Sequence, residues 1–269
     1  MAGSFEVGRS EDEGGAVLMA GRRRASSMTR REVQIDSLAD SVHRHADRAI
    51  VCIDVLLSST SAVTSLAQGR RTVLATTVEE ARLRGRSLNE AVLMGEPGLP
   101  GVQGPEFCPG PCALESRGEG DVVVVSPAAK LLYDAQCAHA VYVACLRNMS
   151  ATAELLAERH DRVTLVGAGY GGEVRYEDQM VAAWIAGKLV AHGFEPAGLH
   201  TVREIERWSK VEPSVAALGR GAEHLRRLGQ GQELHFVLSR VDDLDLACRF
   251  QGGELRQVWR SPARSLVSH

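Results

Sequence analysis

The sequence predicts an α/β protein with a mostly parallel sheet and flanking helices. Short apolar runs alternate with amphipathic segments of helical length from residue 32 to residue 192, which is the rhythm of successive βαβ units with right-handed crossovers. Two of the runs, residues 49–53 and the all-valine residues 122–125, have no polar position. This is typical of strands that are buried on both faces of a parallel sheet.

The first half of the chain supplies five strand predictions and three helix predictions. The strands are residues 32–35, 49–53, 72–75, 91–94 and 122–125. A helix through residue 68 follows the second strand, and a capping box of Thr77 and Glu80 opens a helix to about residue 86. Pro127 suits the first turn of a helix that continues over residues 128–136. Residues 96–120 form a long loop rich in Gly and Pro, and loops of that length are usually functional or disordered.

The second half continues the alternation. Strands are predicted at residues 140–145 and 162–166, and helices at residues 150–160 and 176–192, the latter ended by Gly193 as a C-cap. Residues 199–208 and 214–228 are predicted as helices, and residues 233–238 and 255–259 as late strands. Residues 31–269 are then predicted to form one α/β region. The same pattern leaves open a division into two subdomains that meet near residues 120–150. Residues 1–30 are polar and rich in Gly and Ser, and we expect a disordered tail that is not a secretory signal.

Composition excludes several classes of function. With 269 residues and 44% hydrophobic residues, the chain can bury a substantial core. A net charge of −3 gives no basic field for nucleic acid, and no apolar run reaches the length of a membrane span. Six cysteines without dense spacing indicate a reduced, cytoplasmic protein. The expected partner is a small-molecule substrate, and the sequence leaves a homo-oligomer open.

Asp54 is the most informative residue. It stands at the carboxyl end of the apolar strand over residues 49–53, where a buried charge needs a metal, a cation or several hydrogen-bond donors. Ser59, Thr60 and Ser61 follow at the start of a helix. Hydroxyls at a helix N-terminus, at the crevice of an open α/β sheet, favour an anion site. The structural alternative is that Asp54 caps the helix.

Residues 49–61 resemble the Asp-Val-Leu-Arg-Ala-Thr-Thr-Thr signature of the 2-phosphosulfolactate phosphatases, a family of magnesium-dependent α/β phosphatases. The resemblance runs from about residue 32 to the C-terminus and keeps the order of the family motifs. The other matches are residues 95–97 with Gly-Glu-Arg, residues 106–112 with Gly-Phe-Asp-Leu-Gly-Asn-Ser, residues 126–130 with Thr-Asn-Gly-Thr-Arg, Asn148 and Ala151 with Asn-x-x-Ala, and residues 167–178 with Ala-Gly-Thr-x-Gly…Glu-Asp.

The resemblance implies a site at which Mg²⁺ is held by four acids. These expected metal ligands are Asp54, Glu96, Glu177 and Asp178, with Asp54 and Glu96 also expected to act in catalysis. Acids in the first turn of a helix are favoured by its dipole anyway. Because adjacent helical residues diverge, we expect only one of Glu177 and Asp178 to point inward.

Other groups complete the expected site. Asn148 either acts in catalysis or caps a helix, and Gly169 and Gly171 belong to a glycine-rich turn whose backbone N–H groups could cradle an anion. Lys130 falls where the family carries an arginine and could supply a cation. A solvated loop acid for Glu96 and a surface lysine for Lys130 are the plain structural alternatives.

The departures from the family concern anion recognition. Leu57 and Pro97 replace two arginines, and Cys108 replaces an aspartate. Arginine is suited to bidentate recognition of phosphate or sulfonate, and neither leucine nor proline can take its place. We therefore expect a substrate less anionic than a phosphosulfonate, and we expect Leu57→Arg to improve turnover of anionic phosphomonoesters.

The sequence Cys108-Pro-Gly-Pro-Cys112 is not explained by the family. It could hold a metal, form a regulatory disulfide, supply a Cys108 nucleophile, or fill a proline-stiffened loop. The leading prediction is a metal-assisted phosphate-monoester hydrolase with an altered substrate. The alternatives are a family-derived enzyme of different chemistry in a specialised biosynthetic pathway, and a non-catalytic binding protein on the same fold.

Overall fold

The computed structural model describes residues 30–37, 39–96 and 98–260. The strands are β1 (Glu32–Asp36), β2 (Ala49–Ile53), β3 (Thr72–Ala75), β4 (Val92–Gly95), β5 (Phe107–Cys108), β6 (Val122–Val125), β7 (Ala140–Ala144), β8 (Arg162–Gly167), β9 (Glu195–Pro196), β10 (Leu246–Gln251) and β11 (Glu254–Arg260). The α-helices are α1 (Ser58–Ala67), α2 (Val78–Gly85), α3 (Pro111–Ser116), α4 (Pro127–Asp134), α5 (Met149–Arg159), α6 (Tyr176–Ala191), α7 (Gly198–Trp208), α8 (Arg220–Arg227) and α9 (Gly231–Ser239). Short 3-10 helices lie at η1 (Ala39–His45), η2 (Ala135–Cys137) and η3 (Pro213–Leu218). The predicted tail lies outside the described residues, apart from Arg30.

The strands of the described residues form one sheet in the order β5-β4-β6-β3-β11-β10-β7-β2-β8-β1-β9. Strands β3 to β6 pair in parallel at one end, and β7, β2, β8, β1 and β9 pair in parallel at the other. The antiparallel hairpin of β10 and β11 joins the two halves, through β7 on one side and β3 on the other. The prediction of an α/β fold with a mostly parallel sheet and flanking helices is confirmed. The division into two subdomains remains a prediction.

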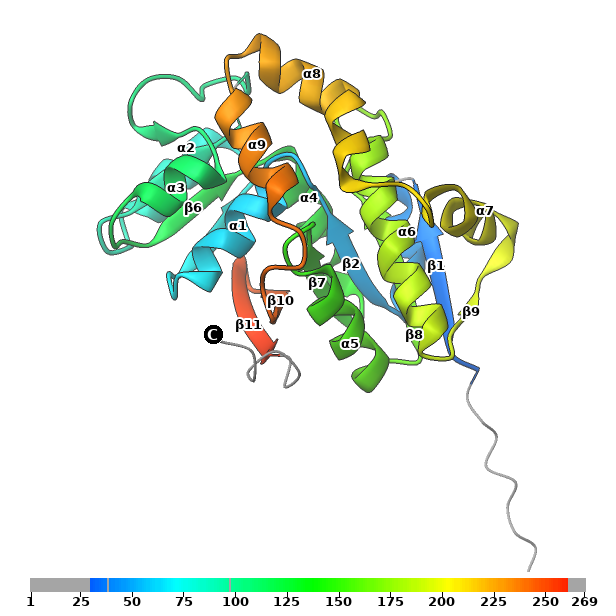
Figure 1. Ribbon diagram of the computed structural model, residues 1–269. Coiled ribbons are helices and arrows are strands. Elements are labelled where there is room, and N and C mark those ends of the chain that lie inside the picture. The colour runs from blue at the N-terminus through cyan, green and yellow to red at the C-terminus, as the bar shows by residue number, and fades with distance from the viewer. Residues whose placement is uncertain (1–29, 38, 97, 261–269) are drawn as a thin grey trace, which may run out of the picture.

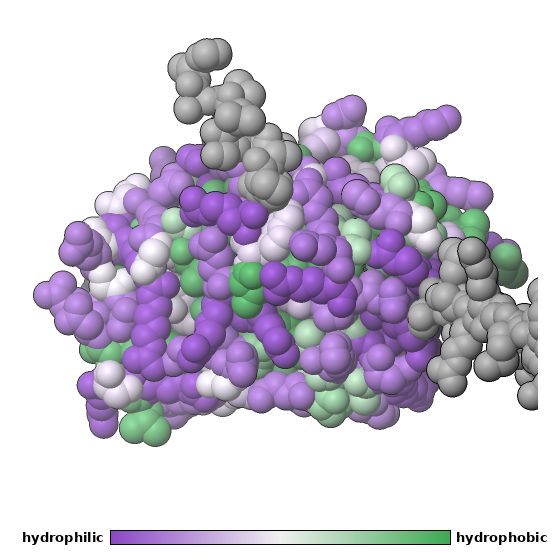
Figure 2. Space-filling model, turned by 90° about the horizontal axis from the view of Figure 1, so that it is seen from below, coloured by the Kyte–Doolittle hydropathy of each residue, from purple (hydrophilic) through white to green (hydrophobic). Residues whose placement is uncertain are grey.

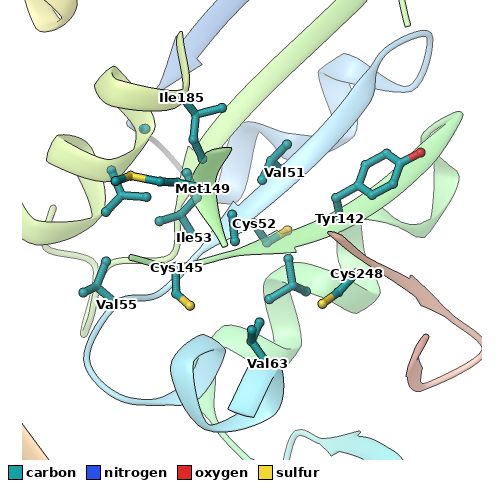
Figure 3. Close-up of a cluster of buried hydrophobic side chains, with 14 of the residues drawn as sticks. Val51, Cys52, Ile53, Val55, Val63, Tyr142, Cys145, Met149, Ile185 and Cys248 are labelled. Carbon is teal, nitrogen blue, oxygen red and sulfur yellow. The ribbon is translucent and has the colours of Figure 1, made fainter. Parts of the chain in front are cut away.

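Strand β2 lies inside the larger parallel half and is buried along its whole length. Figure 3 shows Val51, Cys52 and Ile53 of this strand among side chains from β7, α1 and α6. Its last residue, Ile53, is in register with Ala144 of β7 and Gly167 of β8. The three strands therefore end at the same level, so the segments that follow them meet at one edge of the sheet. Figure 1 shows β1 and β2 ending toward the top of the view, where α8 lies across that edge.

Two predictions in the C-terminal third are wrong. Residues 233–238 belong to helix α9, because Glu233, Leu234 and Val237 are buried at helical spacing; a short apolar run does not distinguish helix from strand by itself. Residues 214–228 do not form one helix, since Gly219 adopts an extended conformation and separates η3 from α8. The predicted loop over residues 96–120 contains β5 and α3. Strand β10 was not predicted.

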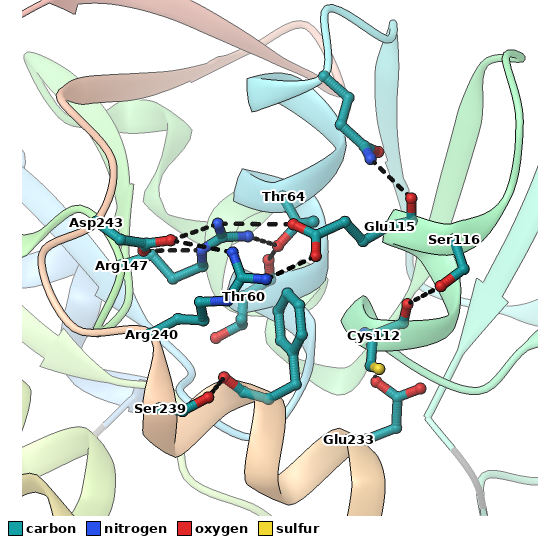
Figure 4. Close-up of polar contacts among 12 residues, drawn as sticks. Thr60, Thr64, Cys112, Glu115, Ser116, Arg147, Glu233, Ser239, Arg240 and Asp243 are labelled. Atoms are coloured by element: carbon teal, nitrogen blue, oxygen red, sulfur yellow. Dashed lines mark hydrogen bonds and ion pairs between the residues drawn. The ribbon is translucent and has the colours of Figure 1, made fainter. Parts of the chain in front are cut away.

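A buried arginine ties the helices near the hairpin together. Arg147 follows β7 and donates to both carboxylate oxygens of Asp243, at 3.0 and 2.7 Å, and to Thr64 Oγ1 of α1 at 2.8 Å. Arg240 pairs with Glu115 of α3 at 2.8 Å beside it. Figure 4 shows this network, in which Arg147 and Arg240 connect to α1 and α3. Because the guanidinium is buried and fully paired, it fixes the position of α1 relative to the start of α5.

One face of the surface is mainly hydrophilic (Figure 2). Figure 2, which views the molecule from below, shows mainly hydrophilic side chains with hydrophobic ones scattered among them. Across the described ranges, no helix combines the length and apolar character needed to cross a membrane.

Candidate active site

A small acidic pocket lies where the two parallel halves of the sheet approach each other. It encloses about 20 Å³, which is room for about one water molecule or one metal ion. The segment after β2 reaches the other half of the sheet, because Ser58 Oγ donates to Ser126 Oγ at 2.5 Å just after β6. The pocket is lined by Asp54, Leu56, Glu96, Ala128, Gly169, Tyr170, Arg175, Glu177, Asp178, Gly221 and His224.

Asp54 directly follows β2 and is buried. Its backbone N–H donates to Ser59 Oγ at 3.2 Å, and the Ser58 hydroxyl beside its carboxylate favours the charged form. Burial, and then the negative charge of Glu177, raise the pKa of Asp54 to about 6, although Ser58 and Arg175 oppose the rise. The carboxylate is therefore poised to change its protonation state near neutral pH or to bind a cation.

Glu96 directly follows β4 and is also buried. Burial, and then the nearby charge of Asp54, raise the pKa of Glu96 to about 8, while Arg175 lowers it. Two neighbouring buried acids are unfavourable for folding when both are charged. A pair of this kind is typical of a site that holds a cation or moves a proton.

Glu177 and Asp178 both point into the pocket from the first turn of α6, so the expectation that only one of them would do so is wrong. Both side chains line the pocket because the N-terminal end of α6 faces it. The two oxygens of Asp178 accept from Val55 N at 2.9 Å and Gly169 N at 3.2 Å, which ties the segments after β2 and β8 together. Burial, then the charges of Asp54 and Glu177, raise the pKa of Asp178.

The Glu177 carboxylate packs against the start of α8. Its Oε2 is buried without a hydrogen-bond partner among the described residues, and burial raises its pKa. A Cβ on Gly221 would lie 2.2 Å from Glu177 Oε1. A Cβ at position 221 would displace the carboxylate, so the backbone of α8 lies directly against this acid.

Ser59, Thr60 and Ser61 do not line the pocket. Ser59 Oγ accepts from the backbone of Asp54, Thr60 Oγ1 donates to Val55 O at 2.8 Å, and Ser61 Oγ donates to Leu57 O at 3.0 Å. The three hydroxyls thus stabilise the turn between β2 and α1 and the first turn of that helix. Their predicted role in substrate binding stays a prediction that this arrangement does not favour.

Leu57 is completely buried in the hydrophobic core, and its neighbour Leu56 faces the pocket. An arginine at position 57 would place an unpaired charge in that core. The expectation that Leu57→Arg improves turnover is therefore replaced by an expectation of lost stability. Pro97, the other arginine replacement, lies outside the described residues.

Asn148, Lys130 and Gly171 lie away from the acidic pocket. Asn148 is buried at the start of α5, where its Oδ1 accepts from Cys145 N at 3.0 Å and its Nδ2 donates to Val143 O at 3.3 Å. Lys130 is exposed and pairs with Asp134 one turn along α4, at 2.5 Å. Lys130, Gly169 and Gly171 line a separate, shallower hollow beside the pocket.

The sequence Cys108-Pro-Gly-Pro-Cys112 connects β5, which ends at Cys108, to α3, which begins at Pro111. The buried carboxylate of Glu233 accepts from Cys112 N at 2.6 Å and Ala113 N at 2.9 Å, and Figure 4 shows it beside Cys112. Both cysteines are free thiols, and burial raises the pKa of each. Neither lines the acidic pocket. Glu233 thus caps α3, and the arrangement favours the structural interpretation of this motif over a Cys108 nucleophile.

Arg175, Tyr170 and His224 line the pocket without having been predicted. Arg175 is the N-cap residue of α6, two positions before Glu177, so its place in the sequence was a usable signal. Its guanidinium lies 5.3 Å from the centre of the Tyr170 ring. His224 comes from α8, and its Nε2 is buried without a partner among the described residues. No local pattern distinguishes His224 from a surface histidine of an amphipathic helix.

The donor set suits a hard cation. Mg²⁺ prefers oxygen ligands and is usually held by one or two carboxylates, with water and substrate oxygens completing the shell. Asp54, Glu96 and the unpartnered Glu177 supply such oxygens around a space of ionic size. No three His, Cys, Asp or Glu side chains in the described parts of the chain are arranged to hold one metal ion. A metal here would therefore be held by fewer carboxylates than the four predicted.

Comparison with known proteins agrees with this geometry. Residues 36–251 match the family model described as 2-phosphosulpholactate phosphatase. A protein of Deinococcus radiodurans is 36% identical over 169 residues, covering 60% of this chain and 68% of its own. A protein of Synechococcus sp. (strain WH7803) is 29% identical over 187 residues, covering 67% of this chain and 76% of its own. Both relatives carry the name "probable 2-phosphosulfolactate phosphatase". The chain therefore belongs to the 2-phosphosulpholactate phosphatase family.

Proposed function

We propose that this protein is a metal-assisted phosphate-monoester hydrolase acting on a small molecule. The observation that carries the proposal is the convergence of Asp54, Glu96, Glu177 and Asp178 on one buried pocket at the carboxyl ends of the strands. In open α/β sheets this edge is where ligands bind. The phosphatase names of its relatives supply the class of reaction.

Each acidic residue of the pocket has its own proposed role. Asp54 and Glu96 would hold Mg²⁺, which when bound polarises a phosphoryl group and activates water, and Glu177 lines the same pocket. Asp178 uses both oxygens on the backbone, so it orients Asp54 instead of binding the ion. Glu96 has a raised pKa without a bound cation, and a cation held beside it would favour its charged form. Helix α8 covers Glu177 and keeps bulk water from that side of the pocket.

We also propose that the substrate carries fewer anionic groups than 2-phosphosulfolactate. Among the described residues that line the pocket, Arg175 is the one permanent cation. Leu57 faces the core and Lys130 is engaged with Asp134, so neither offers a charge to a second anionic group. Efficient hydrolysis of 2-phosphosulfolactate by the unmodified protein would contradict this part of the proposal.

The test is hydrolysis of p-nitrophenyl phosphate with Mg²⁺ and with EDTA. We expect activity that depends on the metal and is lost in Asp54→Asn, which keeps the shape of the side chain and removes its charge. Glu119→Gln, at an exposed loop acid, is the matched control and should retain activity. Activity that persists in EDTA and in Asp54→Asn would contradict the proposal.

Two further measurements test the two alternatives. Loss of activity on thiol alkylation, without any metal dependence, would favour a cysteine enzyme, although Cys108 is buried away from the pocket. Calorimetric binding of Mg²⁺ and phosphate without turnover of any phosphomonoester would favour a binding protein.

A further inference from the structure

We propose that Arg175 is the anion-binding and specificity-determining residue of the pocket, receiving the phosphoryl oxygens of the substrate through its guanidinium. This inference rests on the proposed function, because it assigns a partner to the same site. It also gives the pocket the cation that the sequence assigned to Lys130.

The first argument is the availability of the Arg175 charge. Two other cations of this region are engaged: Lys130, in the neighbouring hollow, pairs with Asp134 at 2.5 Å, and Arg220, next to the pocket-lining Gly221, pairs with Glu173 at 2.8 Å. Within the described part of the chain, no carboxylate lies within ion-pair distance of the Arg175 guanidinium. Its N–H donors therefore remain free for a ligand that enters the pocket.

The second argument is the position of Arg175 in a rigid frame. Its guanidinium lies against the ring of Tyr170 at 5.3 Å from the ring centre, which restricts the plane of the donor fork. The turn that carries Tyr170 is closed by two backbone hydrogen bonds with Glu173, both 3.0 Å. Gly169 precedes this turn at a φ of +64°, and a Cβ there would meet Glu173 O at 2.5 Å. The donors are thus preorganised, which lowers the cost of binding an anion.

The third argument is charge balance. Arg175 is close enough to Asp54, Glu96 and Glu177 to lower the pKa of each. The negative charges of these three carboxylates alone would repel a phosphate ion. The pocket has room for about one ion, so a phosphoryl group would meet the Arg175 guanidinium from outside it, through the two parallel hydrogen bonds that a planar guanidinium makes with phosphate.

The buried Nε2 of His224 supports the same side of the pocket. It has no partner among the described residues, and the His224 ring lies 6.2 Å from that of Tyr170. A polar atom buried without a partner is rare in a folded protein. A ligand oxygen in the pocket, which His224 lines, would supply that partner.

The test is calorimetric binding of inorganic phosphate at saturating Mg²⁺, together with binding of Mg²⁺ alone. Arg175→Met removes the charge and keeps the length of the side chain; Arg220→Met, at an exposed arginine already paired with Glu173, is the control. We expect Arg175→Met to weaken phosphate binding roughly 10- to 100-fold. We expect Mg²⁺ to bind at least as tightly, because a like charge has been removed. Arg220→Met should match the unmodified protein in both.

Two further variants separate the contact from general electrostatics and from misfolding. Arg175→Lys keeps the charge but not the two-pronged geometry, so phosphate affinity should fall between that of Arg175→Met and the unmodified protein. Arg175→Gln is a second neutral variant and should repeat the result of Arg175→Met. Unchanged phosphate affinity in the neutral variants would overturn the inference, as would loss of both phosphate and Mg²⁺ binding. If the unmodified protein binds no phosphate with Mg²⁺, the proposed function fails; if it binds phosphate and the neutral variants equal it, only the role of Arg175 fails.

Discussion

Removing the charge of Glu96 should stabilise the metal-free protein. Glu96 is buried beside Asp54, and its pKa rises from the ordinary 4.5 to about 8 because of burial first and the Asp54 charge second. The unfolded chain ionises Glu96 near its ordinary pKa, whereas the folded chain keeps the proton until about pH 8. Unfolding therefore releases a proton between these values, and the free energy of unfolding falls as the pH rises through that window.

The size of the effect follows from the two pKa values. With one pKa unit equal to about 1.4 kcal/mol, the Glu96 carboxyl costs about 1 kcal/mol at pH 5 and about 3 kcal/mol at pH 7. Glu96→Gln cannot ionise, so it should recover about 3 kcal/mol at pH 7 and almost nothing at pH 4. For a domain of this size, that gain corresponds to roughly 6–12 °C in melting temperature.

The assay is thermal melting at pH 4 to pH 8 in EDTA, followed by the same series with Mg²⁺. In EDTA, the melting temperature of Glu96→Gln should rise increasingly above that of the unmodified protein as the pH increases. The melting temperature of Glu119→Gln, the exposed control, should equal that of the unmodified protein at each pH. Excess Mg²⁺ should reverse the order, since ligand at about a hundredfold excess over Kd adds about 2.7 kcal/mol to the protein that binds it. Equal or lower melting temperature for Glu96→Gln at pH 7 in EDTA would refute the reasoning.

Four further predictions concern the core, the cysteine motif and the tail. Leu57→Arg should lower the free energy of unfolding by about 3–5 kcal/mol, because it buries an unpaired charge in the core; urea denaturation measures this loss, and an unchanged midpoint would contradict it. Glu233→Gln should cost about 1–3 kcal/mol in the same assay, since it weakens the acceptor for two N–H groups at the start of α3. The thiol of Cys137 is exposed and should react with Ellman's reagent quickly, whereas that of Cys108 should react only on unfolding; rapid labelling of Cys108 would restore it as a nucleophile. A chain beginning at Met28 should keep the melting temperature of the full chain, as expected if the polar tail does not pack on the body.

The acids of the site could be predicted because strand ends are readable in the sequence. Apolar runs identify β2 and β4, and a polar residue directly after such a run lies at the carboxyl edge of the sheet. Asp54 and Glu96 meet this description. The pairing of Glu177 with Asp178 could not be read in the same way, since it depends on α6 meeting the pocket end-on.

The hydroxyls and Arg175 show where sequence reasoning fails. Serine and threonine in a helix can satisfy themselves on the backbone four residues earlier, as Ser61 does with Leu57, so a hydroxyl cluster does not by itself mark an anion site. Arg175 owes its place to the tight turn from Tyr170 to Glu173 and to packing against Tyr170. Its proximity to Glu177 in the sequence could have marked it as a candidate, but its position against Tyr170 follows from tertiary contacts, which no local pattern encodes.

The hairpin of β10 and β11 has a consequence for the order in which the chain acquires its structure during synthesis. Both strands are made after the strands they join, yet they pair with β7 on one side and β3 on the other. Until residues 246–260 have left the ribosome, the two parallel halves lack the strands that connect them. Each half then presents an unpaired strand edge to its surroundings, which is the kind of surface that promotes aggregation. These two strands, which follow all the other described strands in the chain, thus close the sheet and complete the scaffold on which the acidic pocket is held.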